Sequence, residues 1–195
     1  ILDRRNLGFH SGMASDFLVD LMESGVVTNI TKPFDRGVST TAILLGKTKL
    51  YEFADNNKEL KLRPSWHTHS GDVHLLKNFV SINSALEVDL TGQVGAEELN
   101  GIPVSAIGGQ PDLVRAAHRS DGGHAIIALP SSAKHGKFSR IVSKLSGPVT
   151  TARSDVDVIV TENGAADLRG KDLGQRRQAL ISIAAPNFQE DLMKT

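Results

Sequence analysis

Residues 104–129 read VSAIGGQPDLVRAAHRSDGGHAIIAL, and this stretch decides the fold class. Its first four residues form a short apolar run that predicts a β-strand, and Gly108 and Gly109 predict a turn directly after it. Pro111 suits the first turn of a helix, because the amide hydrogen that proline lacks has no partner there. Residues 124–129 form a second apolar run and predict another strand. A strand, a glycine turn, a helix and a strand in this order indicate an α/β fold.

Towards the amino terminus, helix-like and strand-like segments continue to alternate. Apolar residues recur every three or four positions over residues 14–24 and predict a helix that ends at Gly25. Residues 41–45 predict a strand and residues 49–54 a helical turn. Residues 79–90 alternate apolar and polar side chains, which predicts one strand with a packed face and a polar face.

Towards the carboxyl terminus, residues 156–161 form an apolar run that predicts a strand covered on both faces. The last helix is expected to begin at Asp172, with Gln175 completing a capping box, and to end at Pro186. No internal repeat or long linker interrupts the pattern. We therefore expect residues 1–195 to form one α/β domain, with an open, largely parallel sheet and flanking helices.

Composition excludes several functional classes. The chain has 22 Lys and Arg against 22 Asp and Glu, so its formal net charge is zero and it lacks the overall basic charge of nucleic-acid-binding proteins. No run approaches the roughly 18 to 20 apolar residues of a membrane-spanning helix. There is no cysteine, which removes thiolate nucleophiles and cysteine-bound metals. No nucleic-acid or membrane partner is expected, and the cytoplasm is the default location.

The residues alone offer several candidate sites, each with a structural alternative. Gly108 and Gly109 leave backbone amides free at a helix start, which suits a phosphate or an oxyanion but also an ordinary turn. Glu162 follows a predicted strand and would border the crevice of an open α/β sheet, or cap a turn. The polar face of residues 79–90 places Asn83, Glu87 and Asp89 in one row, lining a cleft or facing solvent.

Two further patterns concern metal and phosphate binding. His67, His69, Asp72 and His74 form H-x-H-x-x-D-x-H, which contains ligand types that zinc accepts. Nothing in this pattern fixes the side chains on one face, so we expect exposed polar residues and no metal site. The basic run over residues 134–140, which includes Lys137, would suit phosphates or form a solvated loop.

Five stretches together resemble one family. They are LGFHSGMASDFLVDLMESGVVTN, NFVSINSALEVDLTGQV, IGGQPDLVRAA, IALPSSAKHGKFSRIV and DVDVIVTENGAADLRGKDL. In this order they are similar to the carboxyl-terminal half of the acetyl-CoA hydrolase/transferase family, which includes acetate, succinate and 4-hydroxybutyrate CoA-transferases. The resemblance implies an amino-terminal partner domain, a CoA thioester bound between the two domains, and no prosthetic group. Such a half-protein would also account for the start at Ile1.

The resemblance also implies residue roles. In these transferases a glutamate attacks the acyl-CoA, forms a mixed anhydride, and then carries CoA as a glutamyl thioester. By resemblance, Gly109 supplies an oxyanion amide, and Asn56 lies near the reacting carbonyl. Glu162 is a supporting carboxylate, with Glu87 a weaker candidate. Gly108, Gly109, Gln110 and Lys137 are expected to contact CoA.

One residue departs from the family pattern. The glutamate belongs in a sequence such as G-I-H-T-E-M, and this chain has Gly8-Phe9-His10-Ser11-Gly12-Met13. Gly12 stands at the expected position of the nucleophile and has no side chain to acylate. Three explanations remain open: hydrolysis by water activated by Glu162, Glu87 or His10, a different carboxylate nucleophile, or a relative without turnover.

The sequence therefore predicts an enzyme that uses short acyl-CoA esters, either for CoA transfer to a small carboxylate or for hydrolysis. A CoA-binding or scaffold protein without catalysis is the alternative, and a hydrolase dependent on a metal at His67, His69 and His74 is a third hypothesis. Self-association is compatible with the family, and the residues do not decide it.

Overall fold

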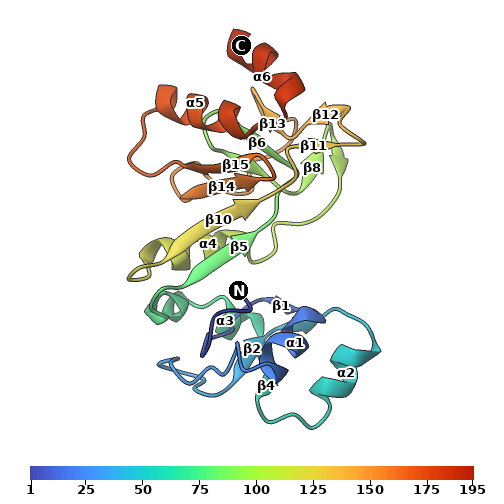
Figure 1. Cartoon of the computed structure of the whole chain (residues 1–195), viewed down its shortest axis with the longest axis vertical. Helices are drawn as coiled ribbons and strands as arrows, with labels where there is room; N and C mark the ends of the chain where they lie inside the picture. The colour runs from blue at the N-terminus through green and yellow to red at the C-terminus, as the bar shows by residue number, and fades with distance from the viewer. The chain divides into compact units, whose positions relative to one another are not determined.

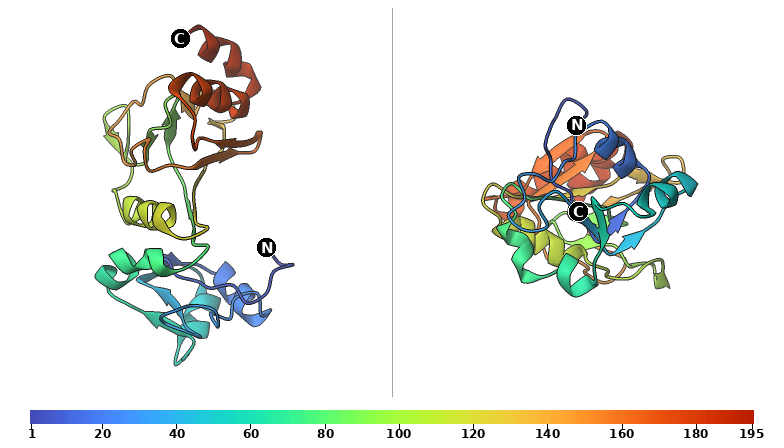
Figure 2. Two further views of the ribbon diagram at one scale, coloured as in Figure 1. Left: turned by 90° about the vertical axis from the view of Figure 1, so that its left-hand side faces the viewer. Right: turned by 90° about the horizontal axis from the view of Figure 1, so that it is seen from below.

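The computed structural model describes residues 1–195, and the contacts within the chain divide it into two compact units, Ile1–Leu76 and Lys77–Thr195. Figures 1 and 2 show the elements of each unit. The expected single domain over residues 1–195 stays a prediction. No helix has both the length and the apolar composition needed to cross a membrane.

The first unit consists of short parallel strand pairs and small helices. The core of this unit is made by Ala14, Leu18, Leu21, Val26, Val27 and Leu60. Strand β1 pairs in parallel with β3, and β2 pairs in parallel with β4. The elements are β1 (Met13–Ala14), α1 (Phe17–Glu23), β2 (Ser39–Thr41), β3 (Ile43–Leu44), α2 (Thr48–Ala54), β4 (Leu60–Leu62), α3 (Ser65–Thr68) and the 3-10 helix η1 (Gly71–Leu75).

The second unit is built on a four-stranded sheet in the order β15-β14-β10-β5 (Figure 1). Strands β5 (Val80–Asn83), β10 (His124–Ala128) and β14 (Val158–Thr161) are parallel, and β15 (Gly164–Asp167) is antiparallel to β14. Helix α4 (Gln110–Arg119) packs against β5 and β10, and α5 (Leu173–Ile183) packs against β14 and β15.

Both helices belong to one hydrophobic core. This core includes Val114 and Ala117 of α4, Ala125 and Ile127 of β10, Ile159, Ala166, Leu180 and Ile183. The buried residues Ala125 and Ile127 of β10 and Ile159 of β14 lie on the same face of the sheet, so the two faces are not equally buried. An open, mostly parallel sheet with flanking helices confirms the predicted fold class.

Smaller elements complete the second unit. Strand β6 lies between β7 and β13 in a three-stranded sheet, and two hairpins pair β8 with β9 and β11 with β12. Helix α6 follows α5 at the carboxyl end of the chain (Figure 2). The bounds are β6 (Glu87–Asp89), β7 (Val94–Gly95), β8 (Glu98–Leu99), β9 (Ile102–Pro103), β11 (Ser132–Ala133), β12 (Phe138–Ser139), β13 (Ile141–Val142) and α6 (Pro186–Lys194).

The predicted single strand over residues 79–90 is wrong. The segment contains β5 and β6, which belong to different sheets. In β5 the expected burial is also inverted, because Ser81 is only 4% exposed whereas Ile82 is 68% exposed. Helix α4 covers the face of the sheet that carries Ser81, and the side chain of Asn83 donates a hydrogen bond to the Ser81 hydroxyl at 2.7 Å.

The predicted strand over residues 104–107 is also wrong. The strand pairing ends earlier, at Pro103 of the β8–β9 hairpin. Residues 104–107 have no regular secondary structure and are exposed. The amides of Val104 and Ser105 both donate to the carbonyl of Glu97, which precedes β8, and not to a paired strand. The strand predicted over residues 41–45 is divided between β2 and β3.

The helix predicted over residues 14–24 and the start of the helix predicted at Asp172 are confirmed. Helix α1 covers most of residues 14–24. Asp172 caps α5, and Gln175 completes the capping box. Pro186 does not end this helix, because α5 stops at Ile183 and Pro186 begins α6.

Candidate functional site

The glycine turn lies directly before α4. Gly108 has φ 59°, in the left-handed region that favours glycine, and Gly109 is the N-cap residue of the helix. The first amides of a helix lack intrahelical partners and attract negative charge. The Gln110 side chain is held by a 3.1 Å hydrogen bond from Nε2 to the Thr151 hydroxyl. This exposed turn therefore has the features of an anion-binding loop.

Glu162 follows β14 and is held by the segment that follows β10. Its carboxylate accepts hydrogen bonds from the Ser131 amide at 2.8 Å and from the Ser131 hydroxyl at 2.6 Å. These bonds, the hydroxyl bond first, lower the pKa of Glu162 below its ordinary value. The side chain is therefore an exposed carboxylate that remains ionised at neutral pH.

Glu162 and the glycine turn belong to the same edge of the sheet. Strands β10 and β14 are parallel, so Ser131 and Glu162 both follow carboxyl ends of strands. Helix α4 leads back to the amino end of β10, which places its first turn towards that carboxyl edge. In open α/β folds this edge is where ligands bind.

Glu87 and Lys137 have other surroundings within the second unit. Glu87 lies on β6 and accepts hydrogen bonds from the amide and the hydroxyl of Ser146, each at 2.9 Å. The expected row of Asn83, Glu87 and Asp89 does not form, because Asn83 lies in another sheet. Lys137 is exposed in the turn between β11 and β12, next to Gly136.

Gly12 and Asn56 both lie in the first unit. Gly12 directly precedes β1, and its carbonyl accepts hydrogen bonds from the amides of Ala42 at 3.2 Å and Ile43 at 3.1 Å. Asn56 is exposed after α2 with φ 55°, and its side-chain amide donates to the carboxylate of Asp55 at 3.1 Å. Asn56 is therefore a solvent-facing turn residue within this unit.

The candidate metal ligands are not brought together. His67 Nε2 contacts the carboxylate of Asp35 at 2.7 Å, whereas His69 and His74 bind backbone carbonyls through Nδ1. No group of three or more His, Cys, Asp or Glu side chains is arranged to hold a metal ion. The geometry therefore gives no support to the metal-dependent hydrolase hypothesis.

A buried polar cluster in the first unit was missed by sequence reasoning. Lys32 is buried, and its ammonium group donates to the carbonyls of Phe9 at 3.1 Å and Val38 at 2.8 Å. Burial lowers the pKa of Lys32 to about 8. Burial alone would raise the pKa of Asp35, but hydrogen bonds from His67 and from Thr40 lower it.

His10 belongs to this cluster and is only 7% exposed. Burial, and then the charge of Lys32, lower the pKa of His10 to about 4, so the ring is neutral at pH 7. Its Nε2 lies 3.1 Å from the Thr68 carbonyl, which only accepts, so Nε2 carries the hydrogen. Nδ1 is buried without a partner. No local motif signals this cluster, because its members come from three separate segments.

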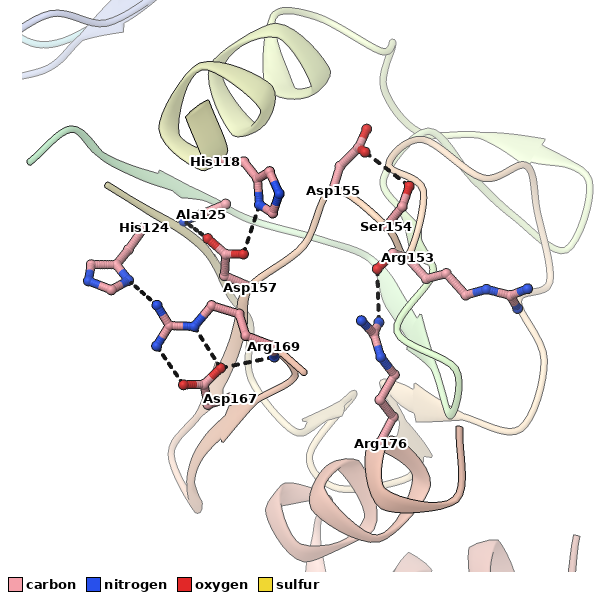
Figure 3. A network of polar contacts seen from close by, with 10 residues as sticks. All are labelled: His118, His124, Ala125, Arg153, Ser154, Asp155, Asp157, Asp167, Arg169 and Arg176. Carbon is pink, nitrogen blue, oxygen red and sulfur yellow. Dashed lines mark hydrogen bonds and ion pairs between the residues drawn. The ribbon is translucent and has the colours of Figure 1, made fainter. Parts of the chain in front are cut away.

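Another polar network lies at the opposite, amino-terminal edge of the sheet (Figure 3). Arg169 binds the carboxylate of Asp167 through two nitrogens, at 3.0 and 2.6 Å, and contacts His124 Nδ1 at 3.0 Å. The hydrogen bond from Arg169 lowers the pKa of Asp167 to about 2. These residues connect β10, β15 and the loop after β15, away from Glu162.

Comparison with known proteins identifies the family of this chain. Residues 46–195 match the family described as acetyl-CoA hydrolase/transferase C-terminal domain. The chain belongs to the acetyl-CoA hydrolase/transferase family. This membership confirms the resemblance carried by the five sequence blocks.

Several known proteins match almost the whole chain. A 4-hydroxybutyrate coenzyme A transferase of Clostridium kluyveri is 44% identical over 200 residues, which cover 98% of this chain and 45% of the relative. The crystal structure of RipA from Yersinia pestis matches with a TM-score of 0.94 and 41% identity, over 99% of this chain and 44% of RipA. An acetyl-CoA hydrolase of Kluyveromyces lactis is 28% identical, over 95% of this chain and 35% of the relative. The chain thus spans less than half the length of these relatives.

Proposed function

We propose that the protein carrying this chain acts on short acyl-CoA thioesters, with CoA as a substrate group and with no prosthetic group. The observation that carries this proposal is the family match over residues 46–195. Relatives in this family are named for CoA transfer and for acetyl-CoA hydrolysis. Because the chain spans 45% of the Clostridium kluyveri transferase, we further propose that an amino-terminal half completes the site. Self-association and a cytoplasmic location remain predictions.

The second unit would bind the thioester through the turn before α4. We assign the amide of Gly109 to the developing oxyanion, and Gly108, Gln110 and Lys137 to contacts with CoA. The free helix start and its dipole support this assignment, since both favour negative charge. Glu162 would be a fixed carboxylate near the reacting group. Asn56 and Glu87 keep their predicted roles with less support, because Asn56 bonds only its neighbour Asp55 and Glu87 is bound to Ser146.

Gly12 favours hydrolysis over CoA transfer. We propose that it occupies the position of the family's nucleophilic glutamate, where transfer would require a covalent glutamyl thioester. Glycine offers no carboxylate, so water is the remaining acceptor at this position. The reaction would then convert an acyl-CoA and water to a carboxylic acid and free CoA.

The deciding experiment measures CoA release by the full-length protein from acetyl-CoA, butyryl-CoA and 4-hydroxybutyryl-CoA. Each substrate is tested with and without a small carboxylate acceptor. We expect release that does not depend on the acceptor. Release that requires acetate or succinate would instead establish transfer, and no release from any thioester would refute an enzymatic role.

Two alternatives predict different results in the same assay series. If Glu162 or Glu87 were a substitute nucleophile, hydroxylamine trapping during turnover would label that residue, and peptide mapping would find it. The two hydrogen bonds from Ser131 argue against Glu162 as the nucleophile, because they lower its pKa and occupy its carboxylate oxygens. A CoA-binding scaffold would show a rise in melting temperature with CoA but no turnover.

A further inference from the structure

The space beside Gly12 is filled by the imidazole of His69. A Cβ atom placed on Gly12 would lie 2.6 Å from His69 Nε2 and 2.9 Å from its Cε1, closer than nonbonded atoms approach. Both residues belong to the first unit, and both are partly exposed. The imidazole therefore stands where a side chain at position 12 would begin.

The backbone at Gly12 does not itself require glycine. Its φ lies outside the left-handed region that several other glycines of this chain adopt. An L-residue would therefore fit the backbone, and only the ring of His69 leaves no room for it. The His69 ring can therefore occupy this position only because residue 12 has no side chain.

His69 is held in one orientation by its own helix. It is the C-cap residue of α3, and its Nδ1 lies 3.2 Å from the Ser65 carbonyl and 2.9 Å from the Thr68 hydroxyl. A carbonyl only accepts, so Nδ1 carries the hydrogen in the neutral ring. Nε2, the nitrogen beside Gly12, then keeps its lone pair.

The helix that carries His69 is fixed to the segment that carries Gly12. The Thr68 carbonyl accepts the hydrogen bond from His10 Nε2, two residues before Gly12. His67, two residues before His69, is bound to Asp35 at 2.7 Å. These contacts of His67 and Thr68 fix the backbone that leads to His69, so the arrangement does not depend on a flexible side chain alone.

We propose that His69 Nε2 is the general base that activates water for thioester hydrolysis. This inference rests on the proposed function. Nε2 removes a proton from water while the water oxygen attacks the thioester carbonyl carbon. The tetrahedral intermediate then breaks its carbon–sulfur bond, and the departing CoA sulfur takes the proton back from Nε2. The products are one carboxylic acid and one CoA thiol, and the ring returns to its neutral form.

His10 fits this role less well than His69. Its free nitrogen is buried, its other nitrogen is committed to Thr68, and its pKa of about 4 makes it a weak base. His67 is paired with Asp35 through Nε2. His69 thus combines a fixed ring, an available lone pair and partial exposure.

The first test compares His69→Gln and His69→Ala with the wild type in the full-length protein. A lost general base lowers kcat by about 100-fold or more, with little change in the KM for the thioester. Imidazole added to the His69→Ala variant should restore part of the rate, in proportion to the concentration of its neutral form. His74→Gln is the matched control, since His74 also binds a backbone carbonyl in this unit, and it should keep the wild-type rate.

The outcomes separate this inference from the proposed function. Wild-type turnover with an unchanged His69→Gln rate would overturn the role of His69 and leave hydrolysis standing. Equal losses of kcat in both variants without rescue by imidazole, together with a lowered melting temperature, would make His69 a structural residue and also overturn the inference. A wild type that releases no CoA from any thioester would refute both proposals.

Discussion

The carboxylate of Asp157, which is 3% exposed, is bonded at 3.1 Å to Nδ1 of His118. Its other oxygen accepts the amide of Ala125 at 3.0 Å. One buried side chain thereby connects the end of α4, the start of β10 and the segment before β14 (Figure 3). This carboxylate stabilises the amino-terminal edge of the sheet that carries Glu162 at its other edge.

Replacing Asp157 with Ala should therefore destabilise the fold. The change leaves a buried amide without a partner and removes the partner of His118, which costs about 2–4 kcal/mol. His118→Ala should cost less, about 1 kcal/mol or below, because the histidine side chain is half exposed. Urea unfolding at pH 7 measures both. Equal losses for the two variants would contradict a central role for the carboxylate.

Stability should fall in mild acid because of His10. The pKa of His10 is lowered to about 4 in the folded chain, from its ordinary value of 6.5. Between these two pH values the unfolded chain binds a proton that the folded chain does not, so stability rises with pH there and is lost as pH falls. The shift corresponds to a loss on the order of 3 kcal/mol at pH 4 relative to pH 7.

The His10→Gln variant isolates this contribution. Glutamine keeps an N–H group for the Thr68 carbonyl but does not titrate. Urea unfolding of both proteins between pH 7 and pH 4 should show a smaller decrease for the variant. Parallel decreases in the two proteins would mean that carboxylates, and not His10, cause the acid sensitivity.

Local signals in the sequence predicted the fold class and the start of α5 but not its end or the strand partners. Asp172 and Gln175 cap α5 as expected, because a capping box depends on residues only three positions apart. Apolar and polar residues do alternate over residues 79–90. The segment nevertheless contains two strands, β5 and β6, which belong to different sheets. Alternation fixes which side chains share a face, but it does not show which face a distant helix will cover.

The candidate site shows the same limit. Glu162 and the glycine turn were found because each lies at a strand or helix end with a recognisable pattern. His69 was recognised only as one ligand of a metal pattern, because its contact with Gly12 joins residues far apart in the chain. The buried Lys32 gave no signal, since lysine is normally exposed and its three acceptors come from several segments.

Removing the hydroxyl of Ser131 should raise the pKa of Glu162. That hydroxyl supplies the first and largest of the interactions that lower it, while the Ser131 amide remains in the Ser131→Ala variant. An NMR titration of the Glu162 carboxyl carbon in both proteins measures the change. A control Ser146→Ala variant, which affects Glu87, should leave the Glu162 titration unchanged. An unchanged Glu162 pKa in Ser131→Ala would show that the amide alone stabilises the carboxylate.

Gly12 and His69 should be coupled in stability. Gly12→Ala places a methyl carbon 2.6 Å from Nε2, so the ring must move and weaken its bonds to Ser65 and Thr68, at a cost of about 1–3 kcal/mol. The same change in a His69→Ala background should cost less, because the space is then free, and the difference measures the coupling. Gly71→Ala is the matched control, since a Cβ there meets no atom within 4 Å. Additive losses in the double variant would contradict the contact.

The same contact predicts an effect on activity. Gly12→Glu combined with His69→Ala should gain CoA transfer that depends on an acceptor, because the glutamate side chain then has room. Gly12→Glu alone should lack this transfer.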